Sequence, residues 1–182
     1  MKLQAGDAAA IEEVFAQYKK PLFNYALRVA GNRADAEDVV SEVFLALSSH
    51  KYSPRPDIKF STWAYAVAHN FAISIIRKRK TTVSFWFQNQ DDETEELQIA
   101  DTSNLPNAVA QERENAVLVK RAIGHLNLAQ KEAIILREYH SLSYDEISQV
   151  MNITLEKVKI LIFRAREQLK KELLSFLREE LP

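Results

Sequence analysis

One segment near the C-terminal end of this chain, residues 143–159, has the pattern of two short helices joined by a tight turn. Ser143 followed three residues later by Glu146 forms a capping box, which starts a helix. Residues 151–153 then interrupt the helical period, and Asn152 tolerates the left-handed backbone that such a turn needs. Thr154 is a candidate cap for a second helix. This spacing predicts a helix-turn-helix, whose second helix enters the major groove of DNA.

The composition of the chain is that of an ordinary folded protein. Its 182 residues are 47% hydrophobic, which allows one or two domains with a buried core. It contains no cysteine, so it has neither a disulfide framework nor a thiolate zinc site. We find no apolar run long enough to span a membrane and no signal peptide, so we expect a cytoplasmic protein without membrane insertion.

The net charge of −1 is unusual for a DNA-binding protein, but the charges are unevenly distributed. Residues 77–80 are four consecutive cations, whereas residues 81–111 contain no Lys or Arg and include six acidic residues. Cations return along the last predicted helix. This alternation predicts two domains, residues 1–80 and 107–182, joined by an acidic linker, residues 81–106.

Helical periodicity dominates both predicted domains, so we expect an all-α protein of two small helical domains. Glycine is only three of 182 residues, and no alternating strand pattern persists except for a weak one at 81–87. Pro21 is tolerable in a first turn, so residues 10–30 form one or two helices. The other predicted helices are 35–48, 61–80, 107–126, 131–140 and the helix-turn-helix, which continues to about residue 179.

The last helix has one face for the core and another for DNA. Val158, Ile162, Ala165 and Leu169 recur at helical spacing and should face the core. The first residues of a recognition helix reach base edges, and cations further along it meet phosphates. The outward set comprises Glu156, Lys157, Lys159, Ile160, Phe163 and Arg164. The alternative, an ordinary solvated face, is less favoured because a capped helix-turn-helix precedes it.

The helix predicted from Ser61 is rich in aromatic residues and ends in the basic run. Rings beside cations suit single-stranded nucleic acid, because an unstacked base can lie on a ring while the cations hold the backbone. Most of these rings are instead expected in the core, at the helical spacing of Trp63, Val67 and Phe71. The polar His69 and Asn70, and the loop before Ser61, are better candidates for base contact.

Three segments together resemble bacterial sigma factors of the extracytoplasmic-function (ECF) group, which keep only regions 2 and 4. They are DAEDVVSEVF at 35–44; KFSTW at 59–63 with AHNF at 68–71 and the basic pair at 77–78; and 142–166, from LSYDEI to FRAR. The resemblance covers nearly the whole chain outside the linker. It implies region 2 in the first domain and region 4 in the second, with core RNA polymerase and promoter DNA as partners.

The resemblance assigns roles to individual residues. Residues 52–61 match the loop that captures a flipped base. Such a loop is needed because the energy spent on opening a duplex is offset only by binding the opened strand. Binding to the polymerase β′ clamp helices is implied for Asp35, Glu37, Asp38 and Glu42. Binding to the −10 element is implied for Lys59, Phe60, Ser61, His69, Asn70, Arg77, Lys78 and Arg79. Binding to the −35 element is implied for Thr154, Glu156, Lys157, Lys159, Ile160 and Arg164.

Other expectations also follow from the resemblance. The second domain binds the polymerase β flap, the acidic linker threads polymerase near the RNA exit path, and many members are held by an anti-sigma factor. A plain disordered spacer is an equal alternative for the linker. The aromatic run 85–87 itself suggests docking onto polymerase, onto the first domain or onto an inhibitor. Ile160 and Leu161 stand where many members have Ser-Arg, so Ile160 either packs on a thymine methyl or makes a weak contact.

Enzyme functions find little support. The four histidines lack metal-ligand spacing, and there is no glycine-rich phosphate loop and no nucleophile motif. We therefore expect no enzyme activity, cofactor or metal. The remaining alternative is a conventional helix-turn-helix regulator that binds duplex operator DNA, which is disfavoured because no dimerisation heptad is present.

Overall fold

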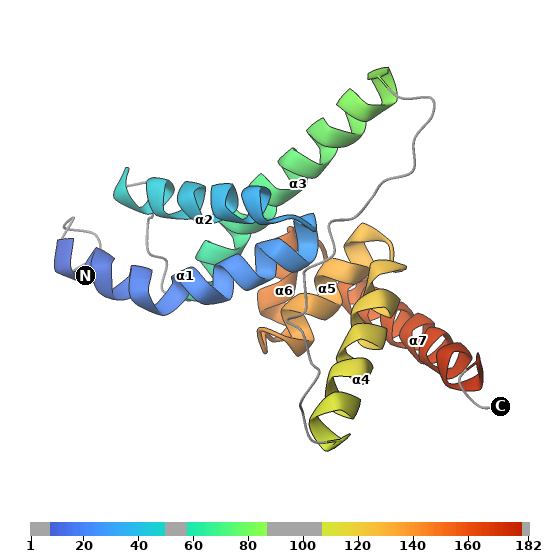
Figure 1. Cartoon of the computed structure of the whole chain (residues 1–182). Coiled ribbons are helices and arrows are strands. Elements are labelled where there is room, and N and C mark those ends of the chain that lie inside the picture. Colours follow the sequence, from blue (N-terminus) through green and yellow to red (C-terminus); the bar gives the residue numbers. More distant parts are fainter. Residues whose placement is uncertain (1–7, 50–57, 87–106, 180–182) are drawn as a thin grey trace.

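The structure, a computed structural model, describes residues 8–49, 58–86 and 107–179. The elements within these ranges are seven α-helices, which confirms the all-α class (Figure 1). The expected base-capturing loop lies largely outside the described residues, as do Phe87 and the rest of the acidic linker. The helices are α1 (Ala8–Ala30), α2 (Arg33–Ser48), α3 (Phe60–Trp86), α4 (Asn107–Gly124), α5 (Leu128–Glu138), α6 (Tyr144–Met151) and α7 (Leu155–Glu179).

The first three helices pack on one another, with α1 and α2 side by side and α3 crossing them (Figure 1). Helix α1 is one continuous helix, and Pro21 lies in its middle rather than in a first turn. Gly31, with φ of 88°, ends α1, and the Asn32 side chain accepts from the backbone N–H of Asp35 to start α2. A residue with a Cβ would be strained at this positive φ, so glycine allows the tight turn.

The last four helices form the second packed group, in which α4, α5 and α6 each contact α7. Asn127 caps α5 by accepting from the N–H of Gln130 at 3.0 Å. The predicted core face of α7 is confirmed, because Val158, Ile162 and Ala165 are buried.

The two groups are in direct contact, since α1 packs on α5 and α3 packs on α6. Their buried apolar side chains form a single continuous cluster. Helix α3 continues to Trp86, so the expected extended segment at 81–87 is wrong for residues 81–86. Helix propagation costs less than nucleation, so a long helix continues through residues of weak propensity.

Candidate nucleic-acid interface

The helix-turn-helix is built as its sequence predicts. Ser143 and Glu146 form both halves of a capping box at the start of α6, which ends at Asn152 in the left-handed conformation (φ 50°, ψ 50°). Thr154 then accepts from the N–H of Lys157 at 3.3 Å, which caps α7. Each helix end therefore has a local partner for its free backbone groups. The turn fixes how α7 is presented to the outside.

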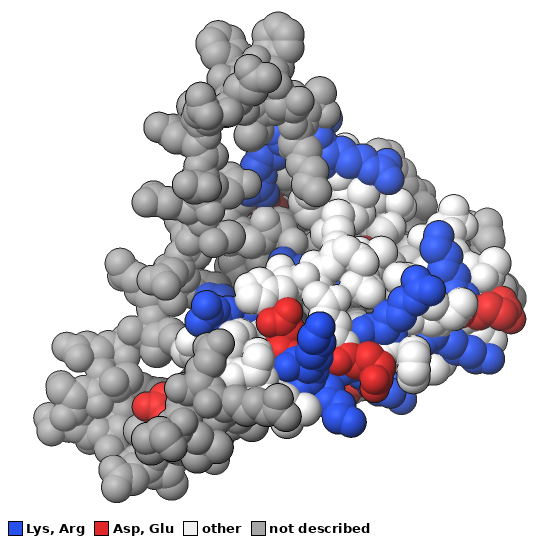
Figure 2. All heavy atoms as spheres, turned by 90° about the vertical axis from the view of Figure 1, so that its right-hand side faces the viewer, with Lys and Arg blue, Asp and Glu red and all other residues white. Residues whose placement is uncertain are grey.

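The outward face of α7 is exposed over its first three turns. Ile160 is 49% exposed and Phe163 is 66% exposed, although both are large apolar residues. Thr154, Glu156, Lys157, Lys159 and Arg164 are exposed beside them. Within the described ranges, the side chains of Lys157, Lys159 and Arg164 form no ion pair. Figure 2, which looks onto the side where α7 ends in Figure 1, shows Lys and Arg side chains spread over the described surface.

The residues at the start of α3 lie between the two helix groups. The Lys59 side chain is 76% exposed, and its Nζ lies 2.9 Å from Oε1 of Glu146 in the helix-turn-helix. Phe60 is half-buried, with its ring 5.1 Å from that of Tyr18 and 5.5 Å from that of Trp63. Phe60 and Ser61 belong to the first turn of α3 rather than to the preceding loop.

His69 and Asn70 are adjacent in α3 but have different surroundings. Asn70 is exposed. His69 is only 14% exposed, and its Nδ1 contacts the carboxylate of Glu132, which comes from α5. Trp63, Val67 and Phe71 pack against the core, as the spacing predicts. Asn70 is therefore open to solvent, whereas His69 is engaged by Glu132 of the C-terminal group.

The basic end of α3 combines exposure with a structural contact. Arg77, Lys78 and Arg79 are exposed. Arg79 also donates to Asp35 of α2 at 2.6 Å and to the carbonyl of Ala30 at 3.0 Å. These bonds tie α3 to the turn between α1 and α2. A charge-assisted bond of this kind fixes geometry while leaving much of the guanidinium at the surface.

The acidic residues of α2 are not equivalent. Asp35 is mostly buried and paired with Arg79, and Glu37 pairs with Arg33 at 2.8 Å. Asp38 is exposed and Glu42 is half-buried. Neither of these two carboxylates has an ion pair within the described part of the chain. Asp38 and Glu42, one turn apart, are therefore the available anions of this face.

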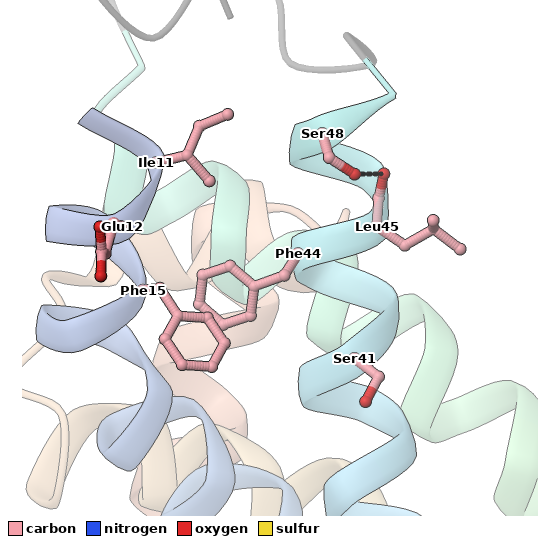
Figure 3. A pocket seen from close by; sticks show the side chains of 7 residues that line it. All are labelled: Ile11, Glu12, Phe15, Ser41, Phe44, Leu45 and Ser48. Atoms are coloured by element: carbon pink, nitrogen blue, oxygen red, sulfur yellow. Dashed lines mark hydrogen bonds between the residues drawn. The ribbon is translucent and has the colours of Figure 1, made fainter. Parts of the chain in front are cut away.

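A groove of about 600 Å³ lies between α1 and α2 (Figure 3). The rings of Phe15 and Phe44 meet at its floor with centroids 4.5 Å apart, and Leu45 is 59% exposed at its edge. Ser41 lines the groove and donates to the carbonyl of Glu37 at 2.9 Å. The groove thus borders the acidic side of α2 and is lined in part by apolar side chains.

A polar cluster, made of Tyr25, Tyr65, His69, Glu132 and His140, lies where the two helix groups meet. The Tyr25 hydroxyl donates to Glu132, and the Tyr65 hydroxyl lies 2.8 Å from Nδ1 of His140. Burial raises the pKa of both tyrosines, and the Glu132 charge raises that of Tyr25 further. Burial, and then the charge of Arg28, lower the pKa of His140 to about 4. His140 is therefore neutral near pH 7, and its Nδ1 forms a hydrogen bond with the Tyr65 hydroxyl.

Sequence reasoning missed Glu132, which is 1% exposed. One signal was present, because Glu132 has helical spacing with Leu128, Ile135 and Leu136 on the apolar face of α5. A carboxylate on such a face is seldom buried without a partner. The spacing is enough to predict that Glu132 has a buried partner, but it does not identify the partner residues.

Two family models match the chain: Sigma-70 region 2 over residues 14–82 and Sigma-70, region 4 over residues 116–169. Together with the helix-turn-helix, they define a sigma factor composed of these two regions. ECF RNA polymerase sigma factor SigW of Bacillus subtilis is 31% identical over 176 residues, covering 94% of this chain and 93% of the relative. The chain therefore belongs to the ECF group of RNA polymerase sigma factors, and the alternative of a conventional operator-binding regulator is not favoured.

Other relatives agree with this assignment. The ECF RNA polymerase sigma-E factor of Escherichia coli is 29% identical over 180 residues, covering 97% of this chain and 93% of the relative. Two solved structures share the fold. The sigma factor RpoE in complex with the anti-sigma factor NepR, from Bartonella quintana, has a TM-score of 0.68 at 21% identity and covers 89% of this chain and 95% of that chain. CnrH bound to the cytosolic domain of CnrY has a TM-score of 0.66 at 20% identity, covering 96% and 94%.

Two features are absent from the described residues. No helix among them has the length and hydropathy of a membrane span. Nor do they contain a group of three or more His, Cys, Asp or Glu side chains arranged to hold a metal ion.

Proposed function

We propose that this sigma factor binds core RNA polymerase in the cytoplasm through α2 and reads promoter DNA through α3 and α7. The observation that carries the proposal is the exposed outer face of α7, which follows a fully capped helix-turn-helix. Glu156, Lys157 and Ile160 stand in the first two turns, where a recognition helix meets base edges. Arg164 lies one turn further along and would meet a phosphate.

The N-terminal domain, proposed as residues 1–80, would hold the polymerase clamp and the opened strand. Asp38 and Glu42 supply the charge for the β′ clamp helices, and the neighbouring groove offers an apolar contact. Exposed Asn70, with the cations at 77–79, suits a single strand whose backbone is negative. Lys59, Phe60, Ser61 and His69 complete the proposed −10 set.

The C-terminal domain, proposed as residues 107–182, would read the −35 element and contact the β flap, with the 81–106 linker between. Two weak sites on one chain reinforce each other through effective concentration. The factor would act by binding, without chemistry of its own. Because the structural neighbour RpoE was solved with an anti-sigma factor, we also propose an anti-sigma partner for this chain.

A reconstituted reaction tests the proposal. Purified protein is added to sigma-free core polymerase with fragmented genomic DNA as template, and transcript 5′ ends are mapped. We expect new start sites preceded by a shared pair of elements, absent without the protein. A second sample with the vegetative sigma factor controls for polymerase activity. Protein that conferred no start sites in this reaction, while the control did, would refute the assignment of function.

A further inference from the structure

The contact between the two helix groups is organised around one buried carboxylate. Glu132 of α5 is 1% exposed, and it accepts from the Tyr25 hydroxyl of α1 while contacting Nδ1 of His69 in α3. Both partners belong to the N-terminal group, 107 and 63 residues away in sequence. Glu132 therefore serves the contact between the groups rather than the interior of its own.

Further polar contacts connect the two helix groups. The Tyr65 hydroxyl meets His140, and Lys59 pairs with Glu146. The guanidinium of Arg28 lies over the ring of Tyr139, 4.2 Å from its centroid. Each pair has one member from the N-terminal helices and one from the C-terminal helices. The junction thus contains several hydrogen-bonded and charged pairs beside its apolar side chains.

Two of these contacts involve residues assigned to the −10 strand. Lys59 and His69 each meet a carboxylate of the C-terminal group, Glu146 and Glu132 respectively. The Glu146 carboxylate on the Lys59 ammonium takes the place that a DNA phosphate would occupy. The arrangement described here is therefore a closed one, in which the C-terminal helices occupy part of the proposed −10 surface.

The chemistry of the junction favours reversible opening. Removing a carboxylate and its polar partners from water costs free energy that their mutual contact only partly returns, because each group loses its hydration. The same groups are rehydrated once the surfaces separate, so opening does not leave them unsatisfied. Removal of one partner destabilises only the closed form. In that form the remaining partners stay buried without a bond, whereas in the open form water hydrates them.

We propose that the contact of Glu132 with Tyr25 and His69 is a latch that holds this sigma factor closed, and that core polymerase binds the opened form. The inference rests on the proposed function, because it assumes that polymerase engages both domains. If only the open form binds polymerase, the apparent affinity equals the affinity of the open form multiplied by the fraction of molecules that are open. Loss of the latch should therefore strengthen polymerase binding.

The absence of cysteine allows site-specific labelling of the full chain. Exposed Ala34 in α2 and Lys170 in α7 are replaced by cysteine and labelled as a fluorescence-transfer pair. We expect Glu132→Ala to lower transfer in the free protein relative to the labelled parent. Glu138→Ala, on the same helix, is the matched control, because Glu138 pairs with Arg166 within its own group at 2.7 Å.

Circular dichroism shows whether each variant remains folded. If Glu132→Ala loses its helical signal, Tyr25→Phe replaces it, because it removes one hydroxyl and keeps the ring. We expect this variant to lower transfer in the same direction, by less. Unchanged transfer in a folded Glu132→Ala variant, or in Tyr25→Phe if that variant is needed, would overturn the latch.

Polymerase affinity is then measured with fluorescent core enzyme. If about one molecule in ten of the parent is open, Glu132→Ala should bind about tenfold more tightly, while Glu138→Ala binds as the parent does. Equal affinity in spite of lower transfer would also overturn the proposal. If none of the proteins bound polymerase, the proposed function would fail, and the transfer measurement would still decide whether Glu132 closes the chain.

Discussion

The Lys59 ammonium lies 2.9 Å from Oε1 of Glu146, so an ion pair links the residue before α3 to the helix-turn-helix. Glu146 also accepts from the N–H of Ser143 at 2.7 Å in the capping box. This backbone bond, and then the bond from Lys59, lower the pKa of Glu146. One carboxylate therefore starts α6 and contacts the N-terminal group at the same time.

Removal of the capping hydroxyl should weaken the C-terminal domain. Ser143→Ala deletes the acceptor for the N–H of Glu146, now at 3.1 Å, and should lower the free energy of unfolding by about 1 kcal/mol. Urea denaturation followed by circular dichroism measures the change. Ser148→Ala is the control, because this hydroxyl bonds only to the Asp145 carbonyl within the same helix. Equal losses in the two variants would contradict a capping role.

Substitution of the recognition-helix cations should separate DNA binding from polymerase binding. Lys157→Ala with Lys159→Ala should reduce promoter-dependent transcription and lower the salt dependence of DNA binding by about one unit of slope per phosphate contact. Affinity for core polymerase should stay unchanged. Lys20→Ala, an exposed cation of α1, serves as the control. If polymerase affinity fell together with DNA binding, the division of roles between the domains would be mistaken.

Charge reversal on α2 should weaken binding to core polymerase rather than binding to DNA. Asp38→Lys with Glu42→Lys introduces cations at the carboxylates we propose for the clamp, so affinity for core polymerase should fall at least tenfold. Circular dichroism should remain unchanged because both positions are at least partly exposed. Glu114→Lys with Glu167→Lys, at exposed positions on α4 and α7, is the control that makes the same change in net charge. Unchanged affinity in the double variant would remove this face from the interface.

His140 should make stability depend on pH. Its folded pKa is about 4, below the ordinary value of 6.5, so between these values the unfolded chain binds a proton that the folded chain does not. Stability from this group is therefore present above about pH 6.5 and is lost as pH falls toward 4.

Urea midpoints at pH 7 and pH 5 measure this dependence. We expect His140→Gln to reduce the difference between the two midpoints relative to the parent protein. Gln149→Ala, a change at an exposed position of α6 that removes no titratable group, is the control and should leave the difference unchanged. An unreduced difference in His140→Gln would show that protonation of other groups accounts for the acid sensitivity.

Much of the fold was predictable because its signals are local. Capping by Ser143, the left-handed Asn152 and the apolar spacing of α7 each depend on residues within one or two turns. Helix α3 extends beyond its predicted end. Thr81 and the following residues have weak helix propensity, so the sequence predicts an end there. The helix before them is already nucleated, however, and it continues through them. Local pattern alone does not show how far a nucleated helix extends.

The polar cluster could not be predicted in the same way. The sequence predicts that His69 faces DNA, because a polar residue on an aromatic helix usually lies at a surface. Its partner Glu132 lies 63 residues away, beyond any periodic pattern. Pairing at such separation is decided by how the two helix groups dock, which depends on many contacts together. The same limit applies to Arg79, whose bond to Asp35 spans 44 residues.

Helix α3 joins surfaces that the family models treat separately. From Phe60, beside the helix-turn-helix, to Arg79, bound to α2, it rises about 30 Å at 1.5 Å per residue. A hydrogen-bonded helix of this length behaves as a stiff rod. Any tilt imposed by α6 at its beginning therefore becomes a sideways displacement at its basic end, so docking on one face is felt mechanically on the other.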